Sequence, residues 1–179
     1  MFNKKAINEN NEFDAIVVGA GVAGLYQLYK LLELKLRVLV LEAGSDVGGT
    51  WYWNRYPGAR FDSESWSYGY SFSEELLQEW SWPEHFAAQP DTLRDLNYVA
   101  DKFDRRKNIK FHSRVAAAHF HEASNRWTIK TETGEEYAAV LMITALGPLS
   151  AFTLPNIPGR DTFKGDAFHT ARWPHEPVD

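Results

Sequence analysis

The sequence of 179 residues contains no cysteine, which excludes disulfide bonds, cysteine-ligated metal sites and any mechanism based on a thiolate. It also lacks a run of 18 apolar residues, so we expect no segment that spans a membrane. Residues 1–12 are polar and lack the apolar stretch of a signal peptide. We therefore expect a flexible leader at residues 1–12 and a cytoplasmic protein.

The sequence also lacks a block of basic charge. Lys and Arg number 19 against 24 Asp and Glu, and the densest cluster is the short run Asp104-Arg105-Arg106-Lys107. A charged stretch of this length is usually a solvated loop or helix end. We expect no nucleic-acid partner, and no feature of the sequence indicates a protein partner.

Aromatic residues are abundant instead. They make up 15% of the chain and include seven tryptophans, four of them between Trp51 and Trp80. Aromatic side chains anchor hydrophobic cores and also pack against flat ligands. Composition alone leaves both interpretations open.

The pattern of apolar residues predicts an α/β fold. A buried strand over 14–19, a helix over 22–36 and a second buried strand over 37–42 form a βαβ unit, whose strands should be parallel. Residues 43–72 read as a long loop with short pieces of structure. A short helix over 73–80, with Ser73 as its N-cap, and a longer helix over 92–106 should follow. We expect strands over 109–121, 126–133 and 136–145, the last two forming a hairpin and 139–146 returning to the central sheet.

A glycine motif lies between the first strand and the first helix. Residues 19–24 (GAGVAG) match the pattern G-x-G-x-x-G in the βαβ context that this pattern requires. Gly19 permits the tight turn, Gly21 leaves room for a pyrophosphate, and Gly24 lets the helix approach the strand. The helix N-terminus offers free N–H groups to phosphates. A glycine turn without a ligand is the alternative.

Glu42 ends the second strand, 18 residues after Gly24, where an acid suits the ribose hydroxyls of a dinucleotide. An acid there disfavours a 2′-phosphate, so this site should hold FAD or NAD rather than NADP. The alternative is a surface glutamate. The glycine pair Gly48-Gly49 follows and favours FAD over NAD.

Two segments carry a resemblance to a known family. Residues 48–62 (GGTWYWNRYPGARFD) resemble the flavin-site segment of Baeyer–Villiger monooxygenases. Residues 163–174 match that family's pattern F-x-G-x-x-x-H-x-x-x-W-P at all five fixed positions, which are Phe163, Gly165, His169, Trp173 and Pro174. The resemblance covers nearly the whole chain after residue 12 and is nearest to the branch that oxidises phenylacetone, steroids and large cyclic ketones.

This resemblance implies a Rossmann-like FAD-binding domain over 13–150, with a β-hairpin or meander insertion. Residues 151–179 would be a linker toward an NADP domain that lies beyond the chain, as does the family's catalytic arginine. The family uses FAD, NADPH and O2 to insert one oxygen atom next to a ketone carbonyl through a C4a-peroxyflavin, which yields an ester or lactone. The isolated chain should then not turn over ketones.

Two other functions stay open: an N- or S-oxidising flavin monooxygenase, and a flavin-binding module without catalysis. The ending of the 163–174 segment favours the Baeyer–Villiger type.

The resemblance also assigns roles to single residues. Asp62 would orient the arginine outside this chain, with a turn or cap residue as the alternative. His169 would be a hinge that couples the two dinucleotide domains, with a hydrogen-bonded linker histidine as the alternative. Expected contacts with FAD are Gly19, Ala20, Gly21, Val22, Ala23, Gly24, Glu42, Ala43, Gly49, Thr50, Trp51, Trp53, Tyr56, Pro57, Asp62, Tyr68, Val115, Ala145 and Gly147.

Some of these contacts have a competing interpretation. The aromatic residues after Gly49 could equally pack in the core. Residues 144–147 (TALG) resemble a short segment where such folds return to the dinucleotide, but Leu146 replaces the usual small polar residue. His119 and His121 alternate on one strand without a third ligand, so we expect no metal site.

Overall fold

The structure is a computed structural model that describes residues 11–178. Its elements follow one another as β1 (Glu12–Val18), α1 (Val22–Glu33), β2 (Val38–Leu41), α2 (Thr50–Trp53), α3 (Ser65–Tyr68), α4 (Glu74–Glu79), α5 (Gln89–Lys102), η2 (Arg106–Asn108), β3 (Ile109–Lys110), β4 (Val115–His121), β5 (Arg126–Thr131), β6 (Glu136–Thr144), η3 (Arg160–Thr162) and η4 (Thr170–Arg172), where η marks a 3₁₀ helix. Most of the expected leader lies outside the described residues, and β1 begins at Glu12, one residue before the domain start expected at residue 13.

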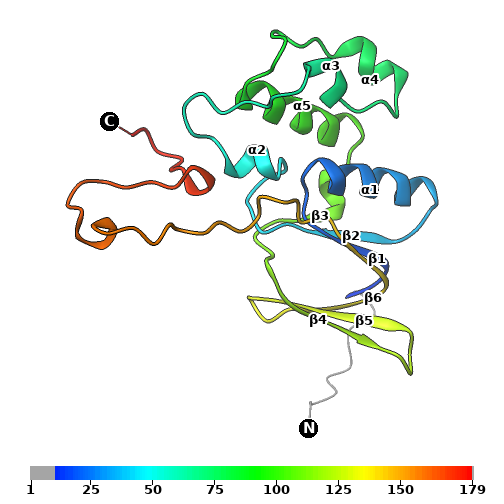
Figure 1. Ribbon diagram of the computed structural model, residues 1–179. Helices are drawn as coiled ribbons and strands as arrows, with labels where there is room; N and C mark the ends of the chain where they lie inside the picture. The colour runs from blue at the N-terminus through cyan, green and yellow to red at the C-terminus, as the bar shows by residue number, and fades with distance from the viewer. Residues whose placement is uncertain (1–10, 179) are drawn as a thin grey trace.

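All six strands form one sheet in the order β3-β2-β1-β6-β5-β4 (Figure 1). β1 pairs in parallel with β2 on one side and β6 on the other, so that Val17 lies between Val40 and Ile143. β5 and β4 continue the sheet as an antiparallel meander. The expected α/β fold, the parallel βαβ unit and the return of the chain to the central sheet are thus confirmed.

The strand expected over 109–121 is wrong. The structure divides it into β3, which pairs with β2 at one edge of the sheet, and β4, which pairs with β5 at the other. His112 has a φ of 53°, a left-handed conformation that ends an extended run. The backbone N–H of Ser113 then donates to the carbonyl of Glu42, and the chain crosses the end of β2 before β4 begins.

The helix expected over 92–106 is shifted in the structure. α5 begins at Gln89, with Pro90 in its first turn. A proline is tolerated there because the N–H groups of the first turn have no partner within the helix. It ends at Lys102, since Asp104 adopts a φ of 51°. The short helix is confirmed as α4, whose cap is the Ser73 hydroxyl accepting from the N–H of Leu76 at 3.2 Å.

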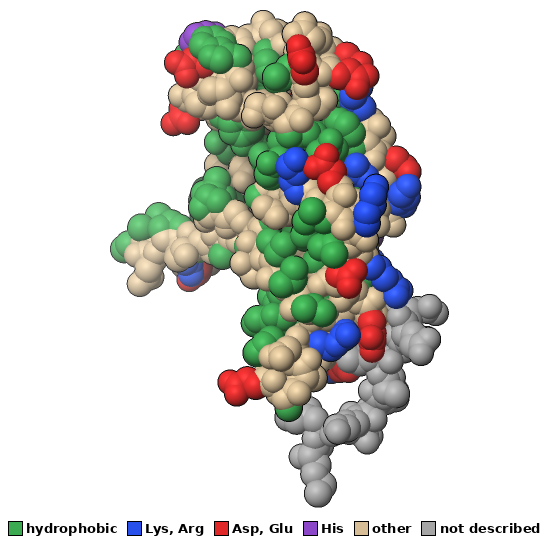
Figure 2. Space-filling view, turned by 90° about the vertical axis from the view of Figure 1, so that its right-hand side faces the viewer, with side chains coloured by type: hydrophobic (Ala, Val, Ile, Leu, Met, Phe, Trp, Pro, Cys, Tyr) green, Lys and Arg blue, Asp and Glu red, His purple; other side chains and the backbone are tan. Residues whose placement is uncertain are grey.

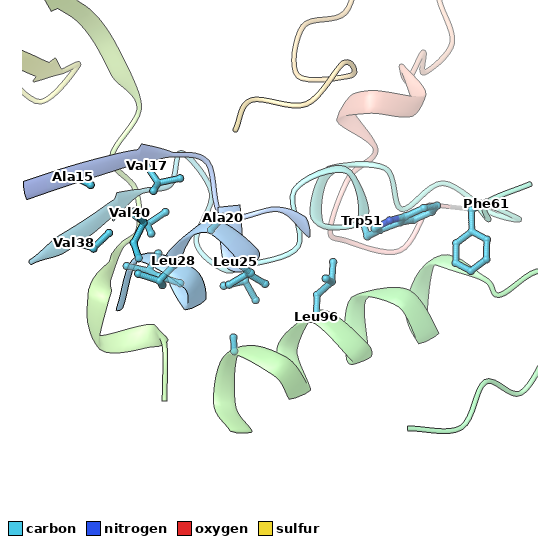
Figure 3. Packing of buried hydrophobic residues seen from close by; sticks show 14 of the residues in the cluster. Ala15, Val17, Ala20, Leu25, Leu28, Val38, Val40, Trp51, Phe61 and Leu96 are labelled. Carbon is cyan, nitrogen blue, oxygen red and sulfur yellow. The ribbon is translucent and has the colours of Figure 1, made fainter. Parts of the chain in front are cut away.

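The main core lies between α1 and the parallel strands (Figure 3). Leu25 and Leu28 of α1 are buried against Val17 and Val40. Complete burial of one such side chain contributes roughly 1.5–3 kcal/mol. Since a helix of 12 residues is marginal in water by itself, this contact holds α1 on the sheet.

Helices α3, α4 and α5 form a second layer, drawn in green in Figure 1. Leu96 of α5 points toward Trp51 of α2, and Phe61 lies beside that ring (Figure 3). Charged side chains of both signs are interspersed on the face shown in Figure 2. Among residues 11–178, no helix combines the length and the apolar character that crossing a membrane requires.

Residues 145–178 leave the sheet and contribute no further strand within the described part of the chain. Drawn in orange and red in Figure 1, they extend away from the body and return beside α2. Many apolar side chains of this stretch are exposed, among them Leu149, Leu154, Ile157 and Phe163.

Candidate functional site

A cleft of about 230 Å³ lies where β1, β2 and β6 end. The carboxyl ends of parallel strands are where α/β sheets bind ligands. Its lining contains nine of the residues expected to contact FAD, namely Gly19, Gly21, Glu42, Ala43, Gly49, Thr50, Trp53, Val115 and Ala145.

A second cleft of about 730 Å³ adjoins the first along α1. The two clefts share Gly21, Gly49, Thr50, Ala145 and Leu146. Four further expected residues line the second cleft, namely Val22, Ala23, Tyr68 and Gly147. The structure thus brings together 13 of the expected contacts around the N-terminus of α1.

The glycine residues are required here because main chain meets main chain. A Cβ added to Gly24 would lie 1.9 Å from the carbonyl oxygen of Gly19. A Cβ on Gly49 would lie 2.7 Å from the Cα of Gly21. The two glycine segments therefore form one surface without side chains at the start of α1, which fits the close approach of a pyrophosphate.

Glu42 bonds to the backbone of the glycine turn and to that of the loop after β2. It is 4% exposed, its Oε2 accepts from the N–H of Ala20 at 2.6 Å, and its Oε1 accepts from the N–H of Gly44 at 2.7 Å. A carboxylate has about four acceptor positions, so two remain after these bonds, and Glu42 lines the first cleft. This geometry excludes the surface-glutamate interpretation, while the contact with ribose stays a prediction.

Some expected residues lie in the wall rather than on the clefts. Ala20 is buried in the glycine turn, and Gly24 is buried in the first turn of α1. Trp51 is 6% exposed; its Nε1 donates to the hydroxyl of Tyr68 at 2.7 Å, and its ring packs edge-on against Phe61. Trp51 therefore supports Tyr68, which lines the second cleft and whose pKa is raised by burial.

Tyr56, Pro57 and Asp62 line neither cleft. Asp62 is exposed and directly follows Phe61, a buried ring that stacks on Tyr68 at 4.4 Å between centroids. The expected role of Asp62 depends on an arginine outside this chain and stays a prediction.

His169 also lies outside both clefts. Its Nδ1 accepts from the N–H of Ala171 at 3.1 Å, which caps η4, and its ring lies 4.6 Å from that of Phe152. These contacts fit the alternative interpretation, a hydrogen-bonded histidine in a linker. The hinge role stays a prediction. Within residues 11–178, no group of three or more candidate side chains could hold a metal ion.

Two arginines of the first cleft were missed by the sequence interpretation. Arg114 directly precedes Val115, and Arg172 occupies a variable position within the 163–174 segment. Only the second had a usable signal, because it lies inside a segment already singled out.

Comparisons with known proteins identify relatives of this chain. Residues 17–74 match the family model described as an NAD(P)-binding Rossmann-like domain. The chain is 49% identical over 93% of its length to an acetone monooxygenase of a Gordonia species, and 47% identical over 94% to a Baeyer–Villiger monooxygenase of Pseudooceanicola batsensis. A phenazine N-monooxygenase of Lysobacter antibioticus is 45% identical over 93% of the chain. In each case the chain covers 31% of the relative.

Solved structures show the same likeness. An oxidized steroid monooxygenase bound to NADP superposes with a TM-score of 0.88 at 52% identity, over 94% of this chain and 32% of that one. OTEMO in complex with FAD and NADP superposes with a TM-score of 0.86 at 48% identity, over 90% of this chain and 30% of that one. The chain is therefore related along nearly its whole length to Baeyer–Villiger monooxygenases, and spans about a third of theirs.

Proposed function

We propose that this chain forms the FAD-binding part of a Baeyer–Villiger monooxygenase. The protein would use FAD, NADPH and O2 to insert one oxygen atom next to the carbonyl of a small ketone. The observation that carries the proposal is the side-chain-free surface where Gly21 meets Gly49, placed between two adjoining clefts. The identity to ketone-oxidising relatives supports the reaction type.

In this proposal each part of the site has its own task. The first N–H groups of α1 and the glycine surface hold the pyrophosphate. Glu42 accepts from the ribose of the adenosine, and the backbone of Val115 meets the adenine. Trp53 and Tyr68 lie at the clefts beside the flavin. When bound, FAD supplies the redox chemistry and the reaction with oxygen.

We further propose separate roles for two parts of the chain and for two single residues. Residues 13–150 are the FAD-binding domain, and residues 151–179 link it to a region that binds NADPH. Asp62 orients an arginine from outside this chain, since a carboxylate behind a guanidinium fixes its fork beside developing negative charge. His169 acts as the hinge. We place the protein in the cytoplasm.

A second candidate function is oxidation of a nitrogen atom, which the identity to a phenazine N-monooxygenase favours. The two functions make different products from one flavin site. A protein that comprises this chain and the sequence downstream of it should convert a cyclic ketone to a lactone. Formation of an N-oxide without any ester or lactone would select the second function instead.

The first experiment is binding of FAD by the protein produced with ample riboflavin. We expect a yellow protein with flavin absorbance, and loss of the chromophore in Gly21→Val. A Cβ on Gly21 would already lie 3.2 Å from the Cα of Gly49, so a branched side chain would push the two glycine segments apart. Ala123→Val is the control, since Ala123 is exposed in the turn between β4 and β5 and lines neither cleft. A colourless wild-type protein that ignores added FAD contradicts the proposal.

A further inference from the structure

Arg172 lines the first cleft, although it lies in the segment 151–178, far along the chain from the glycine motif at residues 19–24. It belongs to η4, which lies beside α2 (Figure 1). Its guanidinium carbon lies 5.0 Å from the ring centroid of Trp53 and 4.8 Å from that of Phe152. Two aromatic rings thus hold the guanidinium at the cleft, a contact that stabilises a cation on each ring.

Most hydrogen-bonding capacity of Arg172 remains free at this place. Its Nη1 donates to the carbonyl oxygen of Ala171 at 2.6 Å, which uses one of five N–H donors. Within residues 11–178, none of the ion pairs involves Arg172. A positive charge without an acidic partner therefore faces a cleft.

The other charged groups of the cleft each have partners within the described residues. The Nε of Arg114 lies 3.8 Å from the carboxylate of Glu132, so its charge is partly balanced. Glu42 uses both carboxylate oxygens on backbone N–H groups. Arg172 is thus the group of the cleft best suited to bind an anion.

We propose that Arg172, which the segment 151–178 places at the cleft, binds the phosphate groups of the dinucleotide. The inference rests on the proposed FAD site. A planar guanidinium offers parallel N–H donors to two phosphate oxygens, and aromatic rings on either side hold its orientation before the ligand arrives. The glycine surface and α1 approach the pyrophosphate from one side, and Arg172 from the linker side.

The segment has a second attachment that does not depend on Arg172. His175 Nδ1 lies 2.7 Å from Nη1 of Arg55, and its ring lies 5.6 Å from that of Tyr52 in α2. A substitution of Arg172 therefore leaves the segment docked on α2. It removes the charge from the cleft, which makes a binding experiment informative.

The test compares FAD affinity in the full chain for wild type, Arg172→Gln and Arg172→Lys at low and moderate salt. A charge-assisted contact to phosphate predicts a loss of roughly tenfold or more for Arg172→Gln, and a smaller loss for Arg172→Lys. Affinity for riboflavin, which has no phosphate, should not change. Arg160→Gln is the matched control, because Arg160 lies in the same segment, pairs with Asp161 and does not line either cleft.

The salt dependence separates recognition of phosphate from a structural effect. Salt screens a charge contact, so the affinity of wild type should fall more with salt than that of Arg172→Gln. An equal loss of affinity for FAD and for riboflavin would show that Arg172 has a structural role. FAD affinity of Arg172→Gln within twofold of wild type would show that Arg172 neither binds phosphate nor supports the site. Either result overturns the inference. A wild-type protein that binds no FAD contradicts the proposed function instead.

Discussion

The two sides of the cofactor clefts are built in opposite ways. On the side of α1, main chain contacts main chain at Gly19, Gly21, Gly24 and Gly49, with no side chain between them. On the side of α2 and α3, the wall consists of rings, where Trp51 packs edge-on to Phe61 and Phe61 stacks on Tyr68. We call these two regions the glycine cradle and the aromatic wall.

The difference predicts how each region responds to substitution. A backbone contact has no rotamer to relax, so an added methyl group must move the main chain. A wall of rings can repack when volume is conserved, and it also accommodates polar groups such as the hydroxyl of Tyr68. The glycine cradle should therefore tolerate the least change and the aromatic wall somewhat more.

The largest expected effect is in the glycine cradle. We expect Gly24→Ala to lower the free energy of unfolding by about 3 kcal/mol, the upper range for overpacking, because its Cβ would overlap the carbonyl oxygen of Gly19. Chemical denaturation measures this directly. Gly69→Ala should be neutral or slightly stabilising, since that backbone is extended and the added Cβ would meet only ordinary contacts with Trp82. If both variants lost the same stability, the contrast between the two regions would be false.

A smaller effect is expected beside the aromatic wall. Asp95 of α5 is 4% exposed, and burial raises its pKa to about 6. Its carboxyl is therefore neutral in the folded state at pH 4 to 5, while in the unfolded chain it has already begun to ionise. The folded state is favoured by this proton at low pH, and the advantage is lost as the pH rises through 6.

Asp95→Asn should remove the loss of stability that ionisation of Asp95 causes as the pH rises. We expect the variant to exceed wild type by about 2 kcal/mol in free energy of unfolding at pH 8, and the difference to shrink toward zero near pH 4. Denaturation curves at both pH values measure it. Asp104→Asn is the control, because that side chain is 72% exposed, and it should show no such pH-dependent difference. A gain for Asp95→Asn that is equal at pH 4 and pH 8 would rule out ionisation as its cause.

The glycine cradle was predictable from sequence, whereas most of the aromatic wall was not. The cradle follows from local features: an apolar run, three spaced glycines and an acid 18 residues later. Whether Trp51 faces a ligand or the core depends on Phe61 and Tyr68, which are 10 and 17 residues away. The separation of β3 from β4 also depends on which strands they meet across the sheet. The 163–174 segment draws attention to Arg172, but its position at the cleft depends on a contact with Trp53 across 119 residues.

Arg106 connects the loop before the glycine pair to α5, and its contact gives the smallest expected effect. Its Nη1 donates to Asp46, which precedes the glycine pair of the cradle, and its Nη2 donates to Asn97 of α5, both at 2.5 Å. A double-mutant cycle with Arg106→Gln and Asp46→Asn should give a coupling of about 0.5–1 kcal/mol, because the pair is only partly exposed and shares further hydrogen bonds. The control cycle uses Lys107 and Asp104, an exposed pair whose coupling should be close to zero. Equal coupling in the two cycles would show that Arg106 is an ordinary surface charge, and that the cradle keeps its place against α5 through apolar contacts such as that of Leu93 with Gly48.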